Sequence, residues 1–399
     1  MKSAKPKKSS MIYYLVLIGF FGIFSTTISK NPVLPLFSSA LNASEFIVGL
    51  IAAVSPLAGI LFSFPIGYLS DKIGFKKLLI LSGFVFLSAP LLYLFVNSAL
   101  WLIPIRFFHG IATAILGPVS ASMIVSVYSK NKGEKLGFYS SSTLIGRTLA
   151  PLIGGIILSM NYFGNLWDYK LVYIAAFILA IPVFVLTLLL KPFKANKLNN
   201  LDFDDFTSSL KYIFINKKIF STALVDLITY FAFGAFETYL PLYLTLKGIP
   251  GYAIGFVFSV QIFSIAFSKP LFGKIADKID KRIQIIIGLF ILGLSFGILG
   301  LVSNIILITV IGVIFGLGLS FSTIATPTYL SEIADKSRIG TTLGGLSSIM
   351  DVGHSLGPFI TGIIISYFSY ELGFFASFIL SIIGIVLFLF CNYDFLKKD

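Results

Sequence analysis

The chain has 399 residues, of which 57% are hydrophobic and only 12% are charged. Soluble globular proteins carry about 25% charged residues, so this composition excludes an ordinary water-soluble protein. We expect lipid to contact most of the surface. The single cysteine, Cys391, excludes disulfides within the chain and cysteine metal sites.

The apolar segments predict membrane-spanning helices rather than a membrane barrel. A spanning helix needs about 20 consecutive apolar residues, whereas a barrel strand needs about 10 residues of alternating character. Residues 78–96 and 171–190 are examples of long apolar segments without alternation. In lipid every backbone polar group needs an internal partner, and helices meet this requirement. The sequence therefore predicts an all-α membrane protein.

The length criterion predicts twelve spans along the chain. In chain order, the expected spans are residues 11–36, 46–69, 78–97, 101–127, 136–159, 171–191, 219–246, 253–273, 283–302, 304–329, 341–367 and 371–392.

The net charge of +13 is explained by loops between spans rather than by a nucleic-acid partner. Lysine and arginine gather in alternate loops, and the opposite loops hold only Lys30, Lys170 and Lys247. By the positive-inside rule, both termini are expected in the cytoplasm of a multi-pass cell-membrane protein. Residues 1–10 resemble the start of a signal peptide. No small-residue cleavage site follows, so we expect the first span to be retained.

The most polar stretch lies near the middle of the chain and predicts a boundary between two halves. Phe203, Phe206, Leu210, Ile213 and Phe214 have helical spacing there, which is typical of a helix lying on the inner membrane surface. The expected organisation is an N-terminal tail, a six-helix bundle, a linker, a second bundle and a C-terminal tail, at residues 1–10, 11–191, 192–218, 219–392 and 393–399.

An internal repeat supports these halves. Asp71 and Asp277 lie 206 residues apart, and Pro151 and Pro358 lie 207 apart. Other pairs at the same offsets are Gly67 with Gly273, Gly110 with Gly316, Pro35 with Pro241, Gly146 with Gly353, and Gly155 with Gly362. Duplicated halves with a site between them are a feature of many secondary transporters.

The segment from Gly67 to Lys77 resembles a signature of the major facilitator superfamily, in which a glycine and an acid precede a basic cluster. The resemblance implies a conformational gate at the cytoplasmic side, closed in one state by the carboxylate of Asp71. The matching positions are Gly67, Asp71, Lys72, Gly74, Lys76 and Lys77, and, in a second copy, Gly273, Asp277 and Arg282. The second copy has Asp280 where the first has Gly74. Alternatively, the lysines only hold the loop inside.

The fifth span resembles the antiporter motif of exporters in this superfamily. The matching residues are Gly137, Gly146, Ala150, Pro151, Gly154 and Gly155, and the eleventh span repeats the pattern with Gly353, Gly357, Pro358 and Gly362. Ala150 departs from the glycine of the family pattern. Small residues let helices approach closely, and a proline weakens the helical ladder, so we expect a bendable seam. The alternative is plain close packing.

Charged residues inside spans are costly and indicate function by default. The candidates for proton coupling or substrate binding are Glu237, Asp351, Asp226, Arg106, His109, Arg147 and His354, together with Asn31 near the end of the first span. Lys269 lies about one turn from the cytoplasmic end of its span and, like Asp226, is equally consistent with a structural role. Arg106 and His109 share a helix face, as do Asp351 and His354.

We hypothesise that Glu237 or Asp351 exchanges a proton during transport. Competition between a proton and a cationic substrate for one carboxylate would couple their movements. The alternative is a static ion pair between Glu237 and Arg106. The first span has no acidic residue, in contrast to many drug exporters, which leaves anionic or neutral substrates open.

The sequence predicts a secondary transporter that exports small amphipathic compounds in exchange for protons, or alternatively sodium, by alternating access. The rivals are a symporter or uniporter for uptake of a sugar, organic acid or peptide, and a non-transporting receptor or scaffold. No phosphate-binding loop or catalytic constellation is found in the sequence, so we expect no enzyme activity, cofactor or metal. We expect a monomer.

Overall fold

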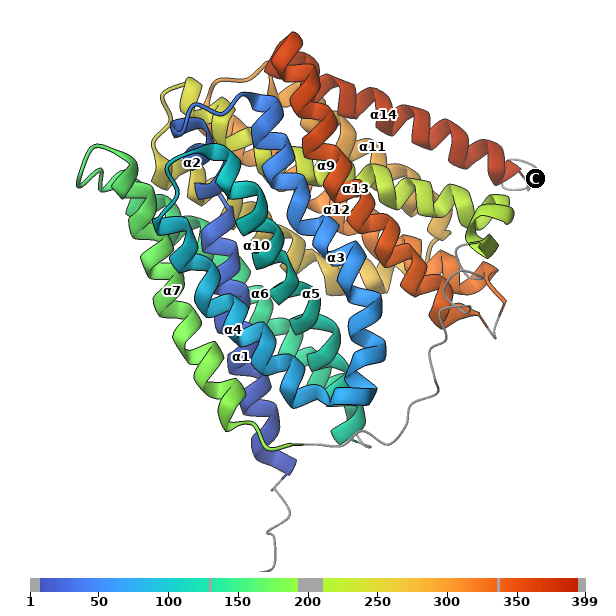
Figure 1. Cartoon of the computed structure of the whole chain (residues 1–399). Helices are drawn as coiled ribbons and strands as arrows, with labels where there is room; N and C mark the ends of the chain where they lie inside the picture. Colours follow the sequence, from blue (N-terminus) through green and yellow to red (C-terminus); the bar gives the residue numbers. More distant parts are fainter. Residues whose placement is uncertain (1–7, 129–130, 193–210, 336–337, 394–399) are drawn as a thin grey trace, which may run out of the picture. The chain divides into compact units, whose positions relative to one another are not determined.

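The computed structural model describes residues 8–128, 131–192, 211–335 and 338–393. Its helices are α1 (Lys8–Lys30), α2 (Val33–Ala40), α3 (Glu45–Ile73), α4 (Phe75–Leu94), η1 (Ala99–Trp101), α5 (Leu102–Val127), α6 (Lys132–Ser159), α7 (Leu166–Leu189), α9 (Lys217–Leu246), α10 (Gly251–Ala276), α11 (Lys281–Leu299), α12 (Ile305–Ile333), α13 (Ile339–Tyr367) and α14 (Tyr370–Cys391) (Figure 1). Twelve segments of the described chain are long and apolar enough to cross a membrane. The all-α membrane fold and its twelve spans are confirmed. The expected surface helix falls mostly on residues 193–210, outside the described residues.

The first span differs from its expected form because it contains two helices. The sequence predicted one continuous span over residues 11–36, whereas α1 ends at Lys30 and α2 begins at Val33. Pro32 separates the two helices. A proline has no N–H to donate and disfavours helical geometry in the residue before it, which accounts for the break.

Contacts between Cα atoms divide the chain into two compact units. Unit 1 comprises Met1–Asn42, Leu57–Leu201 and Pro250–Phe256. Within it, α1 packs against α6 and α7, and α4 packs against α5 and α7. Its core includes Leu79, Phe86, Ile115 and Met123, all of them buried.

Unit 2 comprises Ala43–Pro56, Asp202–Ile249 and Val257–Asp399. Helix α9 is its central element and packs against α13, α14 and α12. Phe236 of α9 stacks on Phe315 of α12 with ring centroids 4.2 Å apart. Stacked aromatic rings add specific geometry to the apolar contact, which fixes the register of the two helices.

Side chains cap several helix starts. Asn165, Asn216, Asp280, Asn304 and Ser369 each accept hydrogen bonds from backbone N–H groups in the first turn. These groups have no partner within the helix itself, so the caps define where the helices begin.

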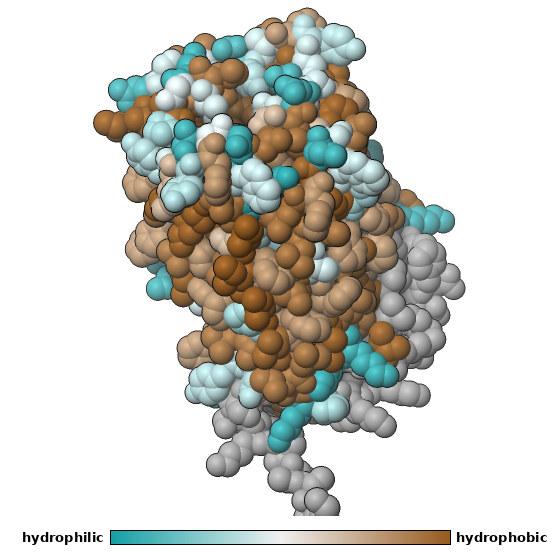
Figure 2. Space-filling view, turned by 60° about the vertical axis from the view of Figure 1, so that its left-hand side comes forward, coloured by the Kyte–Doolittle hydropathy of each residue, from teal (hydrophilic) through white to brown (hydrophobic). Residues whose placement is uncertain are grey.

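The outer surface is apolar, as expected for contact with lipid. Figure 2 shows a broad hydrophobic region on one face, with hydrophilic side chains gathered toward the ends of that face. Large apolar side chains of α7 are exposed, among them Ile178 and Val185. Such surface would aggregate in water and is stable in hydrocarbon.

Candidate functional site

Unit 2 holds a carboxylate–imidazole pair between two spans. Nε2 of His354 in α13 lies 3.1 Å from Oε2 of Glu237 in α9. The two side chains are 19% and 9% exposed, respectively. Both groups can bind a proton, so their combined charge depends on how many protons the pair holds.

Close packing of α9 on α13 brings the pair together. A Cβ atom at Gly234 would overlap the backbone oxygen and ring of His354, and one at Gly357 would overlap the carbonyl of Phe231. The aromatic rings of Phe233 and Tyr230 lie 5.4 Å and 6.4 Å from the His354 ring. Glycines at the contact therefore set the distance at which the imidazole meets the carboxylate.

Asp351 lies one turn before His354 on α13 and is partly buried. Among the described residues, no hydrogen bond or ion pair reaches its carboxylate. Arg147 of α6, in unit 1, is exposed in this structure. Glu237 belongs to unit 2, and Arg106, its partner in the alternative static ion pair, belongs to unit 1.

A second polar group in unit 2 surrounds Asp226 of α9. Asp226 is 1% exposed, and Oδ1 accepts a hydrogen bond of 2.7 Å from the Thr326 hydroxyl of α12. One turn after Asp226 on α9 and one turn before Thr326 on α12, the hydroxyls of Thr229 and Ser322 lie 3.5 Å apart. No cation of the described residues lies within ion-pair distance of the Asp226 carboxylate. The sequence did not identify Thr326 as its partner.

Unit 1 holds the predicted pair Arg106 and His109, which are 2% and 1% exposed. Tyr93 of α4 and Tyr173 of α7 lie within electrostatic range of Arg106, and their rings stack with centroids 4.2 Å apart. These tyrosines were not among the predicted residues, because nothing in the sequence sets them apart from the other tyrosines. Asn31 is also buried.

All glycines of the predicted antiporter-like motif except Gly137 lie at helix contacts. In unit 1, Gly146 packs on Phe20 and Gly155 packs on Gly251. In unit 2, Gly353 packs on Leu227 and Gly362 packs on Glu45. Gly154 packs on Ile28, and Ala150 is fully buried. Gly137, in contrast, has open space around it.

The repeat extends to these contacts. Gly255 meets the carbonyl of Pro151, and Gly49 meets the carbonyl of Pro358. Each member of the first contact lies 206 or 207 residues from its counterpart in the second. The same offset that relates the motifs in sequence therefore relates the contacts that they make.

The predicted gate residues lie around two helix junctions. Gly67, Asp71 and Lys72 belong to the end of α3, where side chains lie outside the described part. Gly74 has a φ of 86° between α3 and α4, a conformation that favours glycine. The Lys76 ammonium donates to the Leu188 carbonyl at 2.9 Å, which anchors α4 on the end of α7. Lys77 is exposed.

At the second junction, between α10 and α11, helix α11 begins with a different cap. Asp280 caps α11 through its side chain and pairs with Arg282, whose Nη2 lies 2.6 Å from Oδ2. The departure from Gly74 therefore replaces a positive φ with a side-chain cap. Gly273 has open space around it and Asp277 is exposed.

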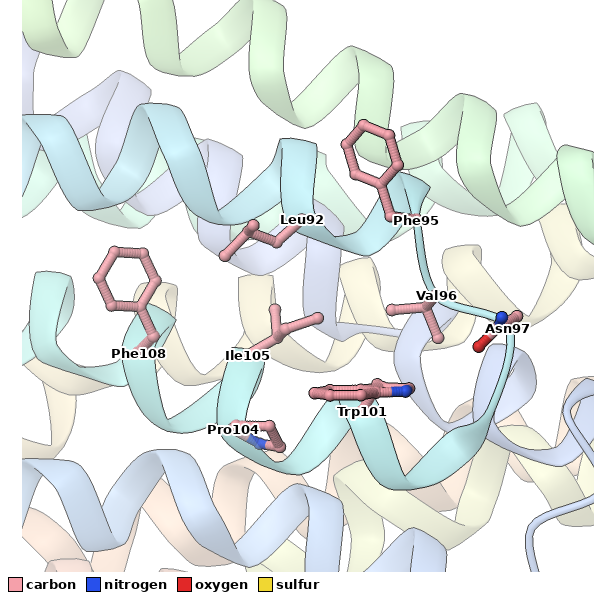
Figure 3. Close-up of a pocket in the computed structure, with 8 residues that line it drawn as sticks. All are labelled: Leu92, Phe95, Val96, Asn97, Trp101, Pro104, Ile105 and Phe108. Carbon is pink, nitrogen blue, oxygen red and sulfur yellow. The ribbon is translucent and has the colours of Figure 1, made fainter.

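A hollow of about 450 Å³ lies between the adjoining ends of α4 and α5 (Figure 3). Its lining is apolar apart from Asn97, and it contains none of the predicted site residues. The lining residues are Leu92, Phe95, Val96, Asn97, Trp101, Pro104, Ile105 and Phe108.

Twelve apolar spans, duplicated helix contacts and charged side chains buried within the spans define the class of polytopic helical transporters. The chain belongs to the Major Facilitator Superfamily, whose sequence profile matches residues 15–260 and 248–398.

Several characterised and uncharacterised proteins are similar over most of the chain. An uncharacterised MFS-type transporter of Methanocaldococcus jannaschii is 27% identical, over 82% of this chain and 84% of that protein. The multi-drug resistance efflux pump PmrA of Streptococcus pneumoniae is 24% identical, over 90% and 91%. The probable nitrate transporter NarT of Staphylococcus haemolyticus is 26% identical, over 92% of each.

The fold also matches solved structures. A bacterial homologue of the human lysosomal transporter Spinster, in an inward-facing and unoccupied conformation, superposes with a TM-score of 0.81. The match covers 99% of each chain at 17% identity, which supports the shared fold. The chain is therefore a multi-pass membrane transporter of this superfamily, and the superfamily is not one of enzymes.

Proposed function

We propose that this transporter lies in the cell membrane with both termini in the cytoplasm. We propose further that it exports small amphipathic compounds across that membrane in exchange for protons. The observation that carries the proposal is the contact between Glu237 and His354. A carboxylate and an imidazole that share one proton are together neutral, and loss of that proton leaves a net negative charge between the spans. Such a charge is costly in hydrocarbon, so the pair would take up a proton again or be compensated by a substrate. Asp351, one turn away on α13, is the second candidate for the exchanging carboxylate.

The exporter reading is supported by the relative named as a multi-drug efflux pump, which matches 90% of the chain. It is also supported by the antiporter-like glycines. Most of those in α6 contact other helices of unit 1, and those in α13 contact other helices of unit 2. A Gly–carbonyl contact has no side chain to lock it, so helices can separate and meet again at small cost.

Uptake of an anion is the second candidate, because a probable nitrate transporter matches 92% of the chain. The two candidates differ in the direction of substrate flow relative to the proton gradient. They do not differ in fold or in the need for a central binding site.

The test uses the purified protein in vesicles with an imposed proton gradient and a panel of fluorescent amphipathic substrates. Export predicts substrate movement against the direction of proton flow, and uptake predicts movement with it. Replacing the proton gradient with a sodium gradient separates the two coupling ions. Substrate movement that ignores both gradients would contradict the proposal.

Variants locate the coupling carboxylate. We expect Glu237→Gln or Asp351→Asn to remove the pH dependence of transport while the protein stays folded. Glu134→Gln is the control, because Glu134 is an exposed residue whose side chain pairs with Lys135 at 2.8 Å. Unchanged pH dependence in both test variants would overturn the assignment.

A further inference from the structure

Arg106 is a charged side chain buried in unit 1 without a compensating partner there. It is 2% exposed, and Nε and Nη1 have no hydrogen-bond partner. Within the described part of unit 1, no carboxylate pairs with it. A guanidinium keeps its proton under all ordinary conditions, so the group cannot escape the cost of burial by becoming neutral.

Side chains around Arg106 also lack hydrogen-bond partners. Both ring nitrogens of His109 and the hydroxyl of Tyr173 are buried without hydrogen-bond partners, and the Tyr93 hydroxyl faces the guanidinium of Arg106. The residues come from three helices, and α4 packs against both α5 and α7. Buried polar atoms are almost always paired, so three neighbouring side chains with unmet hydrogen bonds, Arg106, His109 and Tyr173, indicate a site that a ligand completes.

The chemistry of the cluster favours an anion. The guanidinium offers only donors, in a planar fork that matches the two oxygens of a carboxylate or similar oxyanion. Tyrosine hydroxyls and an imidazole can each add a donor. No described side chain of the cluster supplies a negative charge, so a cationic ligand would meet the repulsion of Arg106.

Aromatic rings line the same cluster. The Tyr93 and Tyr173 rings are stacked with an interplanar angle of 9°, and the His109 ring lies 6.1 Å from Tyr93 and 6.0 Å from Phe86. Phe37 lies 5.6 Å from Tyr173. An apolar body attached to the anionic group would therefore find aromatic surface next to the charge.

We propose that Arg106, with His109, Tyr93 and Tyr173, binds the anionic oxygens of an amphipathic carboxylate or similar oxyanion as the transported substrate. The inference rests on the proposed function and narrows its substrate class from amphipathic compounds to amphipathic anions. Cationic drugs, which many exporters transport, should bind poorly at this site because Arg106 repels them.

The test measures binding by thermal stabilisation of the purified, full-length protein in detergent. The probes are benzoate, octanoate and citrate, each compared at equal ionic strength with chloride and with the uncharged amide of the same acid. We expect at least one carboxylate to raise the melting temperature by several degrees while its amide does not. We expect Arg106→Gln to reduce the affinity for that carboxylate about tenfold or more.

Two further variants guard the test. Arg106→Lys keeps the positive charge without the planar guanidinium. It should bind the carboxylate more weakly than the wild type does but still bind it better than the amide. This variant also serves as the test if Arg106→Gln does not fold. Lys132→Gln, which removes an exposed cation of unit 1, should bind as the wild type does. Binding that persists in Arg106→Gln, equal stabilisation by chloride, or no carboxylate that binds better than its amide would overturn the proposal.

The assay separates this inference from the proposed function, because it requires neither a proton gradient nor a direction of transport. Carboxylate binding at Arg106 without proton-coupled export would remove the export mechanism and leave the anion site standing. Proton-coupled export without carboxylate binding would do the reverse.

Discussion

Gly255 of α10 packs directly against the backbone carbonyl of Pro151 in α6, so closely that a Cβ atom would overlap the oxygen. Gly49 and Pro358 make the equivalent contact in unit 2. In both cases a glycine of one span meets the carbonyl of a proline in the other. The contact therefore tolerates no side chain larger than hydrogen at either glycine.

This packing predicts a clear difference between two glycine-to-alanine variants. Gly255→Ala should destabilise the protein by about 1–3 kcal/mol, because the added methyl group overpacks the contact. Gly344→Ala, at a glycine inside α13 with open space around it, should be neutral or slightly stabilising, since alanine favours the helix by up to about 1 kcal/mol. Thermal unfolding in detergent measures both, and equal melting temperatures would contradict the contact.

The hydroxyl of Tyr239 predicts a second measurable contribution. It lies 2.8 Å from the Pro358 carbonyl and 2.9 Å from the Glu45 carbonyl, and Tyr239 is fully buried. Tyr239→Phe removes the one buried O–H that the two carbonyls share, and the loss should cost about 1–3 kcal/mol. Tyr252→Phe is the control, because Tyr252 is 54% exposed and its hydroxyl has no partner among the described residues. If Tyr252→Phe reduces the stability by the same amount, the loss in Tyr239→Phe does not come from these hydrogen bonds.

The spans were predictable because the length of an apolar run is a property of neighbouring residues. The repeat also pairs glycines that both lie at contacts, since an offset of 207 maps Gly155 onto Gly362. Side-chain partners were not predictable in this way. Glu237 and His354 are 117 residues apart, and only the packing of α9 on α13 determines that they meet. Pro32 did carry a local signal for the break after α1, which a count of apolar residues ignores.

The Asp226 group predicts an effect of removing one hydroxyl. Thr326→Val keeps the shape of the side chain but deprives Oδ1 of its 2.7 Å hydrogen bond, which should cost about 1–3 kcal/mol. Thr323→Val is the matched control on the same helix, because its hydroxyl bonds only the Leu319 carbonyl one turn earlier. We expect the control to change stability by less than about 0.5 kcal/mol.

Asp226→Asn in the Thr326→Val background tests whether the carboxylate causes that loss. An amide is less costly than a carboxylate to bury without a donor, so the double variant should lose less stability than the sum of the two single variants. Strict additivity of the two changes would show that Thr326 stabilises the helix contact by itself.

The contact between Glu237 and His354 predicts a coupling energy in a double-mutant cycle. His354→Ala leaves a carboxylate between two spans without the imidazole at 3.1 Å, and Glu237→Gln removes the charge that the imidazole faces. The two changes should therefore be non-additive by about 0.5–3 kcal/mol, as measured by thermal unfolding. Asp226→Asn with His354→Ala is the control cycle, because Asp226 lies 11 residues before Glu237 on α9, about 16 Å along the helix. Additive behaviour in the first cycle, or equal coupling in both, would mean that the side chains share no proton or charge, and the proposed coupling site would then have to lie at Asp351.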